Sequence, residues 1–299
     1  MLHSNLSKTL SIFLLFCSLT FSANAAYIFI PMDESQSNHL KAYGIAYYAI
    51  ERDVKVDWLL NYQGGSFLIK QHSTIENECN IRGVSYQLIA DVQSTQILQS
   101  IASPEVNQDV VRLEKAPKIA IYSPNNKQPW DDAVTLALTY AEIPYEVIYD
   151  EEVLSNLLPL YDWLHLHHED FTGQYGKFYA SFKNATWYKD QKRDYEILAK
   201  KLGYEKVSTE KLAVAKKIKE FVNGGGFLFA MCSATDSYDI ALAAEGLDIC
   251  GPMFDGDAAD PSAQEKLDFS KTLAFKNFTL VKNPNQYEFS SIDATQKRR

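Results

Sequence analysis

The second half of the chain alternates between short apolar segments and amphipathic helical segments, and this alternation restricts the fold more than any other feature of the sequence. The apolar segments predict strands at residues 119–122, 145–149, 163–167 and 227–231. The amphipathic segments predict helices at residues 130–141, 190–202, 209–223 and 238–245. Strands that alternate with helices form a mostly parallel sheet with helices on both faces. The sequence therefore predicts an α/β fold.

The first half begins with the same alternation and then becomes less regular. A strand is predicted at residues 27–30, a helix at about 36–52 and a strand at 56–60, in the order of a βαβ unit. Residues 61–92 contain only short β-prone pieces, and residues 94–118 read as a polar connector with one short helix. We expect two domains after the first 25 residues, an N-terminal α/β segment at residues 26–115 and a larger α/β domain at residues 116–299.

Residues 1–25 have the pattern of a secretory signal peptide. Lys8 provides the positive start, residues 10–21 form an apolar stretch, and residues 23–25 (Ala-Asn-Ala) form a small-x-small cleavage site. The apolar stretch is shorter than the roughly 20 apolar residues that span a bilayer, and no later segment is long and apolar enough. We expect a soluble exported protein, periplasmic or secreted, whose mature chain begins at Ala26.

The net charge of the chain indicates which classes of molecule it is expected to bind. The formal net charge is −9, and removal of the signal peptide with its lysine makes the chain more acidic. An acidic protein repels nucleic acids and anionic membranes, so neither is an expected partner. A small molecule, a peptide or a glycan is the expected ligand, and no pattern in the sequence indicates a cofactor.

The glycine turn Gly224-Gly225-Gly226 leads into the strand predicted at residues 227–231. Cys232 comes directly after this strand and shortly before a predicted helix. This order places the thiol at the carboxyl end of a strand, where open α/β sheets bind ligands. The amino terminus of the helix favours a thiolate, so we predict a nucleophilic cysteine. The alternative is a buried cysteine that serves only as a small apolar side chain.

The mature chain contains an odd number of cysteines, Cys79, Cys232 and Cys250. At least one thiol is therefore free unless it pairs with another chain. A bridge from Cys250 to either of the other two cysteines is compatible with an oxidising compartment. A bridge that used Cys232 would contradict its role as a nucleophile.

A second cluster of titratable side chains follows the strand at residues 163–167. It consists of His165, His167, His168, Glu169 and Asp170, and holds three of the six histidines of the chain. In a parallel sheet this loop opens at the same edge as the cysteine, so His167 or His168 is the candidate base and Glu169 or Asp170 the orienting carboxylate. The alternative is that these side chains pin the long loop that follows.

Metal binding is the rival chemistry for this cluster. His165, His167 and Asp170 are the candidate ligands, because imidazoles and carboxylates at short spacing bind zinc and similar ions. The His-x-His start resembles the metallo-β-lactamase pattern. However, Glu169 and Asp170 stand where that pattern has Asp and His, and no histidine follows residue 168.

Three further residues are candidates for substrate binding. Asp33 and Glu34 end the first predicted strand, and their carboxylates can join the rim of the site. Their alternative role is to cap the next helix together with Ser35 and Ser37. Ser233 follows the cysteine, where its backbone amide can stabilise an oxyanion.

The motif Ala230-x-Cys232-x-Ala234 between a strand and a helix resembles the nucleophile elbow of the class I glutamine amidotransferase-like superfamily. That resemblance implies a flavodoxin-like sheet and a Cys-His-Glu or Cys-His site that hydrolyses an amide or a related bond. The alanines replace the usual glycines, and the histidine that this superfamily has after the cysteine is missing from residues 233–299.

Most of the mature chain also resembles an exported bacterial family labelled asparagine synthetase B. The segments that carry this resemblance lie at residues 30–34, 57–67 and 165–171. Members of that family continue further, so we expect the present chain to be truncated at its carboxyl end. The label implies glutamine-dependent asparagine synthesis with ATP, and residues 232–237 align with an ATP-pyrophosphatase loop but lack its glycines.

The leading hypothesis is a thiol hydrolase in which Cys232 acts on an amide or a related bond. The second hypothesis is a non-enzymatic binding protein of the cell envelope, whose aromatic residues 171–188 stack on a glycan or a peptide. A metal-dependent hydrolase and an asparagine synthetase are the remaining hypotheses.

Overall fold

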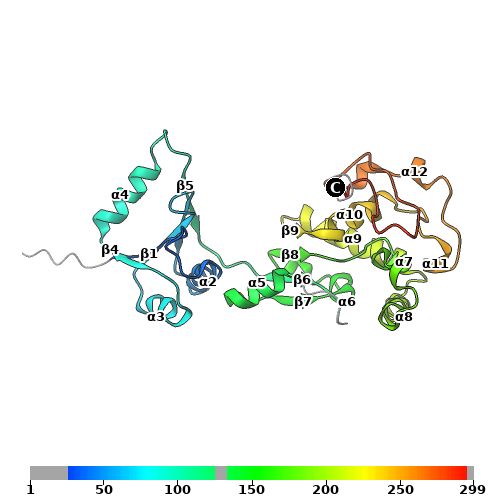
Figure 1. The fold of residues 1–299 in the computed structure, drawn as a ribbon, viewed down its shortest axis with the longest axis horizontal. Coiled ribbons are helices and arrows are strands. Elements are labelled where there is room, and N and C mark those ends of the chain that lie inside the picture. The colour runs from blue at the N-terminus through cyan, green and yellow to red at the C-terminus, as the bar shows by residue number, and fades with distance from the viewer. Residues whose placement is uncertain (1–25, 125–132, 295–299) are drawn as a thin grey trace, which may run out of the picture. The chain divides into compact units, whose positions relative to one another are not determined.

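The computed structural model describes residues 26–124 and 133–294 and divides into two compact units. Unit 1 extends to Ala116 and includes Tyr140–Ile143, whereas unit 2 holds the remaining residues after Ala116 (Figure 1). The predicted signal peptide and the first three residues of the helix predicted at 130–141 lie outside the described ranges. Within those ranges, no helix has both the length and the apolar character needed to cross a bilayer.

Unit 1 contains a five-stranded sheet in which every pair of neighbouring strands is antiparallel. Its strands are β1 (Tyr27–Ile30), β2 (Val56–Leu60), β3 (Ser66–Lys70), β4 (Gln87–Ile89) and β5 (Asp109–Leu113), and its helices are α2 (His39–Ile50), α3 (Ser73–Arg82) and α4 (Asp91–Ile101). The strand order is β4-β1-β3-β2-β5. The predicted βαβ unit is therefore a split one, with β3 between β1 and β2. The prediction of a parallel sheet is wrong for this half of the chain.

The alternation of side chains along β1 explains how unit 1 packs. Ile28 and Ile30 contact α2 and α3 on one face of the sheet, and Phe29 lies on the other face with residues of α4 (Figure 1). Successive side chains of a strand point to opposite faces, so one short strand contributes to both cores. Only Ile75 and Cys79 of α3 are buried, which is too weak an apolar pattern to predict that helix.

Unit 2 contains the predicted parallel sheet, in the order β7-β6-β8-β9. Its strands are β6 (Ile119–Tyr122), β7 (Glu146–Ile148), β8 (Trp163–Leu166) and β9 (Phe227–Ala230), and each end lies within one residue of its prediction. The helices are α5 (Ala133–Ala141), α6 (Asp150–Leu154), α7 (Tyr179–Phe182), α8 (Thr186–Lys201), α9 (Val207–Asn223), α10 (Cys232–Ala243), α11 (Pro252–Asp255) and α12 (Ala263–Lys266). Short 3-10 turns occur at Leu158–Leu160, Tyr175–Lys177 and Phe269–Lys271. The chain is thus a mixed α/β protein.

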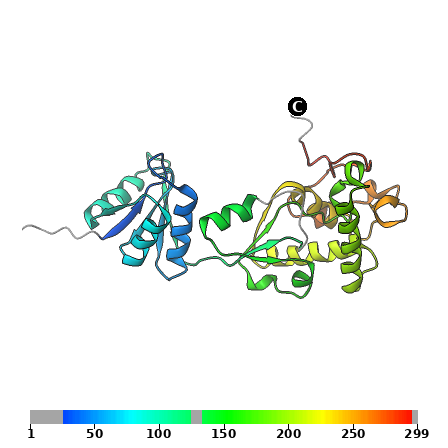
Figure 2. The ribbon, with the colours of Figure 1, turned by 60° about the horizontal axis from the view of Figure 1, so that its bottom comes forward.

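The core of unit 2 lies between the parallel sheet and helices α9 and α10 (Figure 2). Val214 and Ile218 of α9 are fully buried in the same cluster as Leu164 and Leu166 of β8. After α10 the chain has little regular structure. In that region Leu280 and Ser290 form an isolated antiparallel bridge.

A buried ion pair joins α9 to the carboxyl ends of β6 and β7. The Lys211 ammonium lies 2.6 Å from an Asp150 carboxylate oxygen, and both residues are almost fully buried. The same ammonium donates to the hydroxyl oxygens of Tyr122, at 3.0 Å, and Tyr149, at 2.9 Å. Removing one charge from such a pair leaves the other uncompensated in the protein interior.

Glu210 is a second buried acid in this region, with 1% of its surface exposed. Burial raises its pKa from 4.5 to about 8, against the opposing attraction of the Lys211 ammonium. The folded state therefore holds Glu210 largely uncharged at neutral pH. Because the folded pKa exceeds the unfolded one, the stability linked to the neutral carboxyl is complete below about pH 4.5 and is lost as the pH rises towards 8.

The substitution Glu210→Gln should remove this pH dependence. We expect the free energy of unfolding of the variant, relative to the wild type, to increase between pH 5 and pH 8 by about 1–3 kcal/mol, the usual penalty of a poorly compensated buried polar group. Urea unfolding at a series of pH values measures it. Glu220→Gln, at a mainly exposed position of the same helix, is the control and should leave the profile unchanged. Parallel profiles for Glu210→Gln and the wild type would contradict the assignment.

Candidate functional site

Cys232 lies at the turn between β9 and α10, as the sequence predicts, and its thiol is exposed and free. The backbone at this residue has φ of +49°, a left-handed conformation that costs a non-glycine residue about 1–2 kcal/mol. Such strain persists only where the surrounding structure fixes the conformation, and it is concentrated at functional sites.

The turn before β9 has a backbone geometry that requires glycine at two positions. Gly225 has φ of +99°, and a Cβ atom on Gly226 would lie 2.2 Å from the Phe221 ring. Only glycine fits both positions without strain. The turn thus allows α9 to pack against the start of the strand that carries Cys232.

The other two thiols of the described chain differ from Cys232 because they are fully buried. Burial raises the pKa of Cys79 to about 12, and burial followed by the charge of Asp170 raises the pKa of Cys250. All three thiols are free, so neither bridge to Cys250 forms. Cys232 is therefore the accessible thiol among the described residues.

Hydrogen bonds tie the loop after β8 to the start of α10. The backbone amide of Ala234 donates to the carbonyl oxygen of His167 at 3.2 Å, and the Ser233 hydroxyl donates to that of His168 at 2.8 Å. One turn later, the Ser237 hydroxyl donates to the carbonyl oxygen of Glu169 at 2.8 Å. These bonds bring the histidine loop to the edge of the sheet where Cys232 lies.

The three clustered histidines have different environments. His165 is fully buried, and its Nδ1 lies 3.1 Å from the carbonyl oxygen of Phe229 in β9. The rings of His167 and His168 lie close together, with their centroids 3.7 Å apart and their planes tilted by 31°, and both residues are partly exposed. The buried ring of His165 thus links β8 to β9, and the partly exposed pair His167 and His168 is the group that can contact a substrate.

The two acids of the cluster also differ. An oxygen of the Glu169 carboxylate accepts a hydrogen bond of 2.7 Å from the backbone amide of His167. Asp170 accepts bonds from the amide and hydroxyl of Thr172 and from the amide of Gly176. Burial raises the pKa of Asp170, and these hydrogen bonds oppose that shift. Asp170 therefore shapes its own loop, as the alternative interpretation of the cluster expects.

The acids predicted at the end of the first strand lie in the other unit. Asp33 accepts bonds from the amide of Ser35, at 3.0 Å, and from its hydroxyl, at 2.5 Å, and these bonds lower its pKa. Asn38 caps helix α2. The structure does not bring Asp33 and Glu34 together with Cys232 within one unit.

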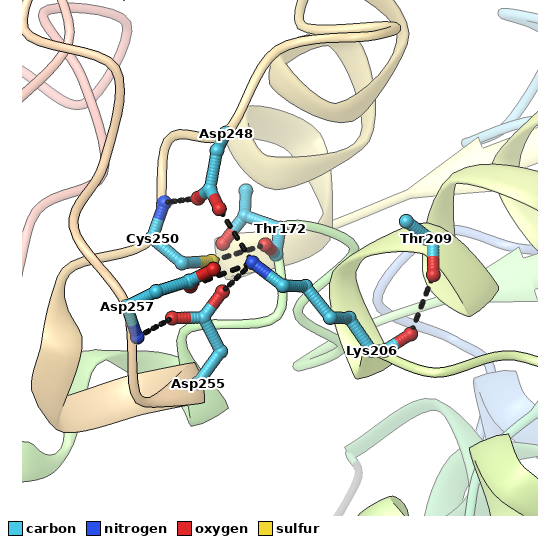
Figure 3. Close-up of polar contacts among 7 residues, drawn as sticks. All are labelled: Thr172, Lys206, Thr209, Asp248, Cys250, Asp255 and Asp257. Carbon is cyan, nitrogen blue, oxygen red and sulfur yellow. Dashed lines mark hydrogen bonds and ion pairs between the residues drawn. The ribbon is translucent and has the colours of Figure 1, made fainter.

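In the described residues, three ligand atoms suited to a metal converge at one place, formed by Asp248, Cys250 and Asp255. The histidine cluster does not produce such a convergence with Asp170. Figure 3 shows that the ammonium of Lys206 lies among the carboxylates, 2.6 Å from Asp248 and 2.9 Å from Asp255. It also lies 2.6 Å from Asp257. A lysine side chain thus supplies the positive charge at this position.

The segment after α10 is anchored by two buried charged groups, Asp236 and Lys177, whose role as anchors was not predicted from the sequence. Asp236 accepts bonds from the hydroxyl of Ser290, at 2.6 Å, and from its amide, at 3.2 Å. The Lys177 ammonium, almost fully buried, lies 2.7 Å from the carbonyl oxygen of Val281. Burial, followed by the charges of Cys232 and Asp293, raises the pKa of Tyr287 in the same segment. The signal for the Lys177 anchor was a single cation among aromatic residues, whereas Asp236 stands between Thr235 and Ser237 and gave no such signal.

The aromatic residues predicted to stack on a ligand pack mainly on one another. Tyr175 and Tyr188 are buried, with ring centroids 6.4 Å apart. Phe178 and Trp187 pack beside them with centroids 5.7 Å apart. These rings form a small core together with other residues of α8 and with Phe254 of α11.

No protein-family model, curated protein or solved structure matches this chain.

The substitution Lys206→Ala should convert the aspartate cluster into a site for a divalent cation. Loss of the ammonium leaves three carboxylates that repel one another, so the melting temperature should fall by several degrees at low ionic strength. Calcium or manganese should restore it, since both ions favour carboxylate oxygens. Differential scanning calorimetry with and without the ion measures both effects. Lys217→Ala removes one exposed ion pair of α9 and is the control. A variant as stable as the wild type and indifferent to both ions would contradict this role of Lys206.

Proposed function

We propose that this chain is an exported amidotransferase-like hydrolase in which Cys232 attacks the carbonyl carbon of an amide or a related bond. One observation carries the proposal: an exposed thiol lies on a left-handed turn between a parallel strand and a helix. Reactive cysteines occur at exposed helix amino termini, and ligands bind at the carboxyl ends of parallel strands.

The strand order of unit 2 supports the more specific fold assignment. The order β7-β6-β8-β9 corresponds to 2-1-3-4, the first four positions of the flavodoxin-like order 2-1-3-4-5. Class I glutamine amidotransferases have a sheet of this kind and place their cysteine at a strand-to-helix turn. The resemblance at residues 230–234 and the strand order thus favour the same superfamily.

The neighbouring residues suit the roles that a thiol hydrolase needs. His167 or His168 acts as the base, because their loop is bonded to the first turn of α10. Glu169 is the better candidate for the orienting carboxylate, since both Asp170 oxygens already hold their own loop. The backbone amide of Ser233, the first after the thiol, is the candidate oxyanion donor.

The reaction follows from these roles. The histidine accepts the thiol proton, and the Cys232 sulfur forms a bond to the carbonyl carbon. The carbon–nitrogen bond then breaks, and the histidine returns the proton to the leaving amine. Water hydrolyses the resulting thioester, which releases the acid and restores the thiol. No oxidant, reductant or metal ion is needed for this sequence.

Residues 232–237 align with an ATP-pyrophosphatase loop, but the contacts of their side chains favour hydrolysis over ATP-dependent synthesis. Asp236 and Ser237 are both buried, and their side chains bond to Ser290 and to the loop after β8. The side chains of Asp236 and Ser237 therefore bind other segments of the protein and are not exposed for binding to a phosphate. Export, which stays a prediction from residues 1–25, would also remove the protein from the ATP supply.

Iodoacetamide should label Cys232 before the other thiols of the native protein. Exposure at the helix amino terminus favours this reaction, and burial protects Cys79 and Cys250. Cys232→Ala should reduce the release of ammonia or amine from a panel of carboxamides and peptides by at least about 100-fold, because the nucleophile is lost. Labelling is followed by peptide mass spectrometry. The unfolded protein is the control, in which all three thiols should react.

Equal labelling of the three native thiols would count against an activated Cys232. Amide hydrolysis that survives in Cys232→Ala would remove the proposed nucleophile, and the fold would then serve binding instead.

The backbone strain at Cys232 can be measured separately from the reactivity of its thiol. Cys232→Gly should raise the free energy of unfolding by about 1 kcal/mol relative to Cys232→Ala, because glycine adopts positive φ without a steric penalty. Both variants lack the thiol, so both should be inactive. Chemical denaturation of the two variants measures the difference. If glycine is no more stable than alanine at this position, the turn is not held under strain.

A further inference from the structure

A cavity of about 370 Å³ lies between helix α9 and the end of α6 in unit 2. It is also lined by the glycine turn at residues 224–226, directly before β9, and by Asp162, directly before β8. The cavity therefore lies at the amino ends of these two parallel strands, whereas Cys232 follows the carboxyl end of β9. It is a site separate from the thiol, and all its walls come from residues 153–226.

The buried part of the cavity wall is apolar. Val153, Leu158 and Phe221 line the cavity, belong to the core of unit 2 and are at most 8% exposed. A Cβ atom on Gly225 would have no neighbour within 4 Å, so the space beside the turn is open. Small-molecule sites have volumes of roughly 300–1,000 Å³ and mainly apolar walls with a few polar groups. The cavity has the size and the wall of such a site.

The charged residues that line the cavity sum to a negative charge. The Lys217 ammonium lies 2.8 Å from a carboxylate oxygen of Glu220, so these two charges largely cancel. The third charged residue, Asp162, accepts a hydrogen bond of 2.9 Å from the backbone amide of Lys118. That donor is uncharged and leaves the carboxylate its negative charge. By charge complementarity, the cavity favours a cation over an anion.

The carboxyl end of α9 strengthens this preference. Such a helix end carries a partial negative charge of about half an elementary charge. The amides of Gly224, Gly225 and Gly226 donate to carbonyl oxygens of α9 at 2.9–3.0 Å, so the turn does not offer them to an anion. A carbonyl oxygen, in contrast, has two lone pairs and can accept a second hydrogen bond from a ligand.

We propose that this cavity binds an organic ammonium ion with an apolar body. The apolar part contacts Leu158 and Phe221, and the ammonium donates to the Asp162 carboxylate and to carbonyl oxygens at the end of α9. A metal ion would leave the apolar wall uncovered, and a neutral molecule would leave the Asp162 charge unmatched. The proposal does not depend on the reactivity of Cys232, so it stands or fails separately from the proposed function.

Phenethylamine, which is protonated at neutral pH, is the probe. Heteronuclear NMR spectra of the full chain, which correlate each amide nitrogen with its proton, measure its binding. The amides of Gly224, Gly225 and Gly226 should shift with a dissociation constant on the order of 1 mM, a usual affinity for a ligand of this size. Phenethyl alcohol and hydrocinnamate have the same apolar body without the positive charge, and both should bind more weakly.

Two charge variants should change the affinity in opposite directions. Asp162→Asn keeps an acceptor for the Lys118 amide and should weaken phenethylamine binding, whereas Lys217→Gln removes a repelling cation and should strengthen it. Each change should be about two- to fivefold, the effect of one partly exposed charge. Lys216→Gln is the matched control. It removes the same charge at the neighbouring position, pairs with Glu245 instead and does not line the cavity, so the affinity should not change.

Several outcomes would overturn the proposal. Unshifted turn glycines at about 20 mM phenethylamine would do so, because a site of the expected affinity would then be almost fully occupied. Equal or tighter binding of the alcohol or of hydrocinnamate would contradict the preference for a cation. Weaker binding to Lys217→Gln than to the wild type would have the same meaning. A shift of Gly246 in place of the turn glycines would assign the amine to the cavity beside Lys206.

Discussion

The left-handed backbone at Cys232 is the constraint on which the arrangement of unit 2 depends. A non-glycine residue keeps this conformation only if its neighbours are fixed on both sides. Here the amide of Met231 bonds to Leu166 at 2.9 Å, and that of Ala234 bonds to His167 at 3.2 Å. The turn is thus held between the end of β8 and the loop that follows it. The same two bonds that maintain the strain also bring the histidine loop to the thiol, so the geometry of the candidate site and the strain have one cause.

Buried carboxylates hold the parts of unit 2 that have little regular structure. Backbone amides in such segments need acceptors when they are buried. Asp239 accepts bonds of 2.7–2.9 Å from the three successive amides of residues 273–275, and Asp236 holds Ser290. Asp170 does the same for the loop after β8. Two of these acids lie on α10, which therefore organises the segment after it as well as carrying Cys232. Part of the acidic excess of the chain is accordingly structural.

The sequence predicted those features that depend on a run of neighbouring residues. The four parallel strands of unit 2 were found to within one residue, because apolar runs between glycine and polar turns have few alternatives. Helix α3 was missed, since only two of its residues are buried. Helix α10 begins earlier than predicted because Ser233, Asp236 and Ser237 make its first turns polar. The antiparallel order of unit 1 depends on pairing between distant segments. The cluster around Lys206 was beyond reach for the same reason: its partners follow it by 42 to 51 residues.

The thiol of Cys232 follows a short strand that lies at the edge of the parallel sheet in the described part of the chain. Strand β9 has four residues, begins at glycines that permit the approach of Phe221, and ends at the strained Cys232. Its ladder of hydrogen bonds is to β8 alone among the described strands. A strand held on one side opens more readily than one held on both, because fewer bonds must break. The stability of β9 against local opening therefore acts directly on the backbone of Cys232, the residue that follows the strand.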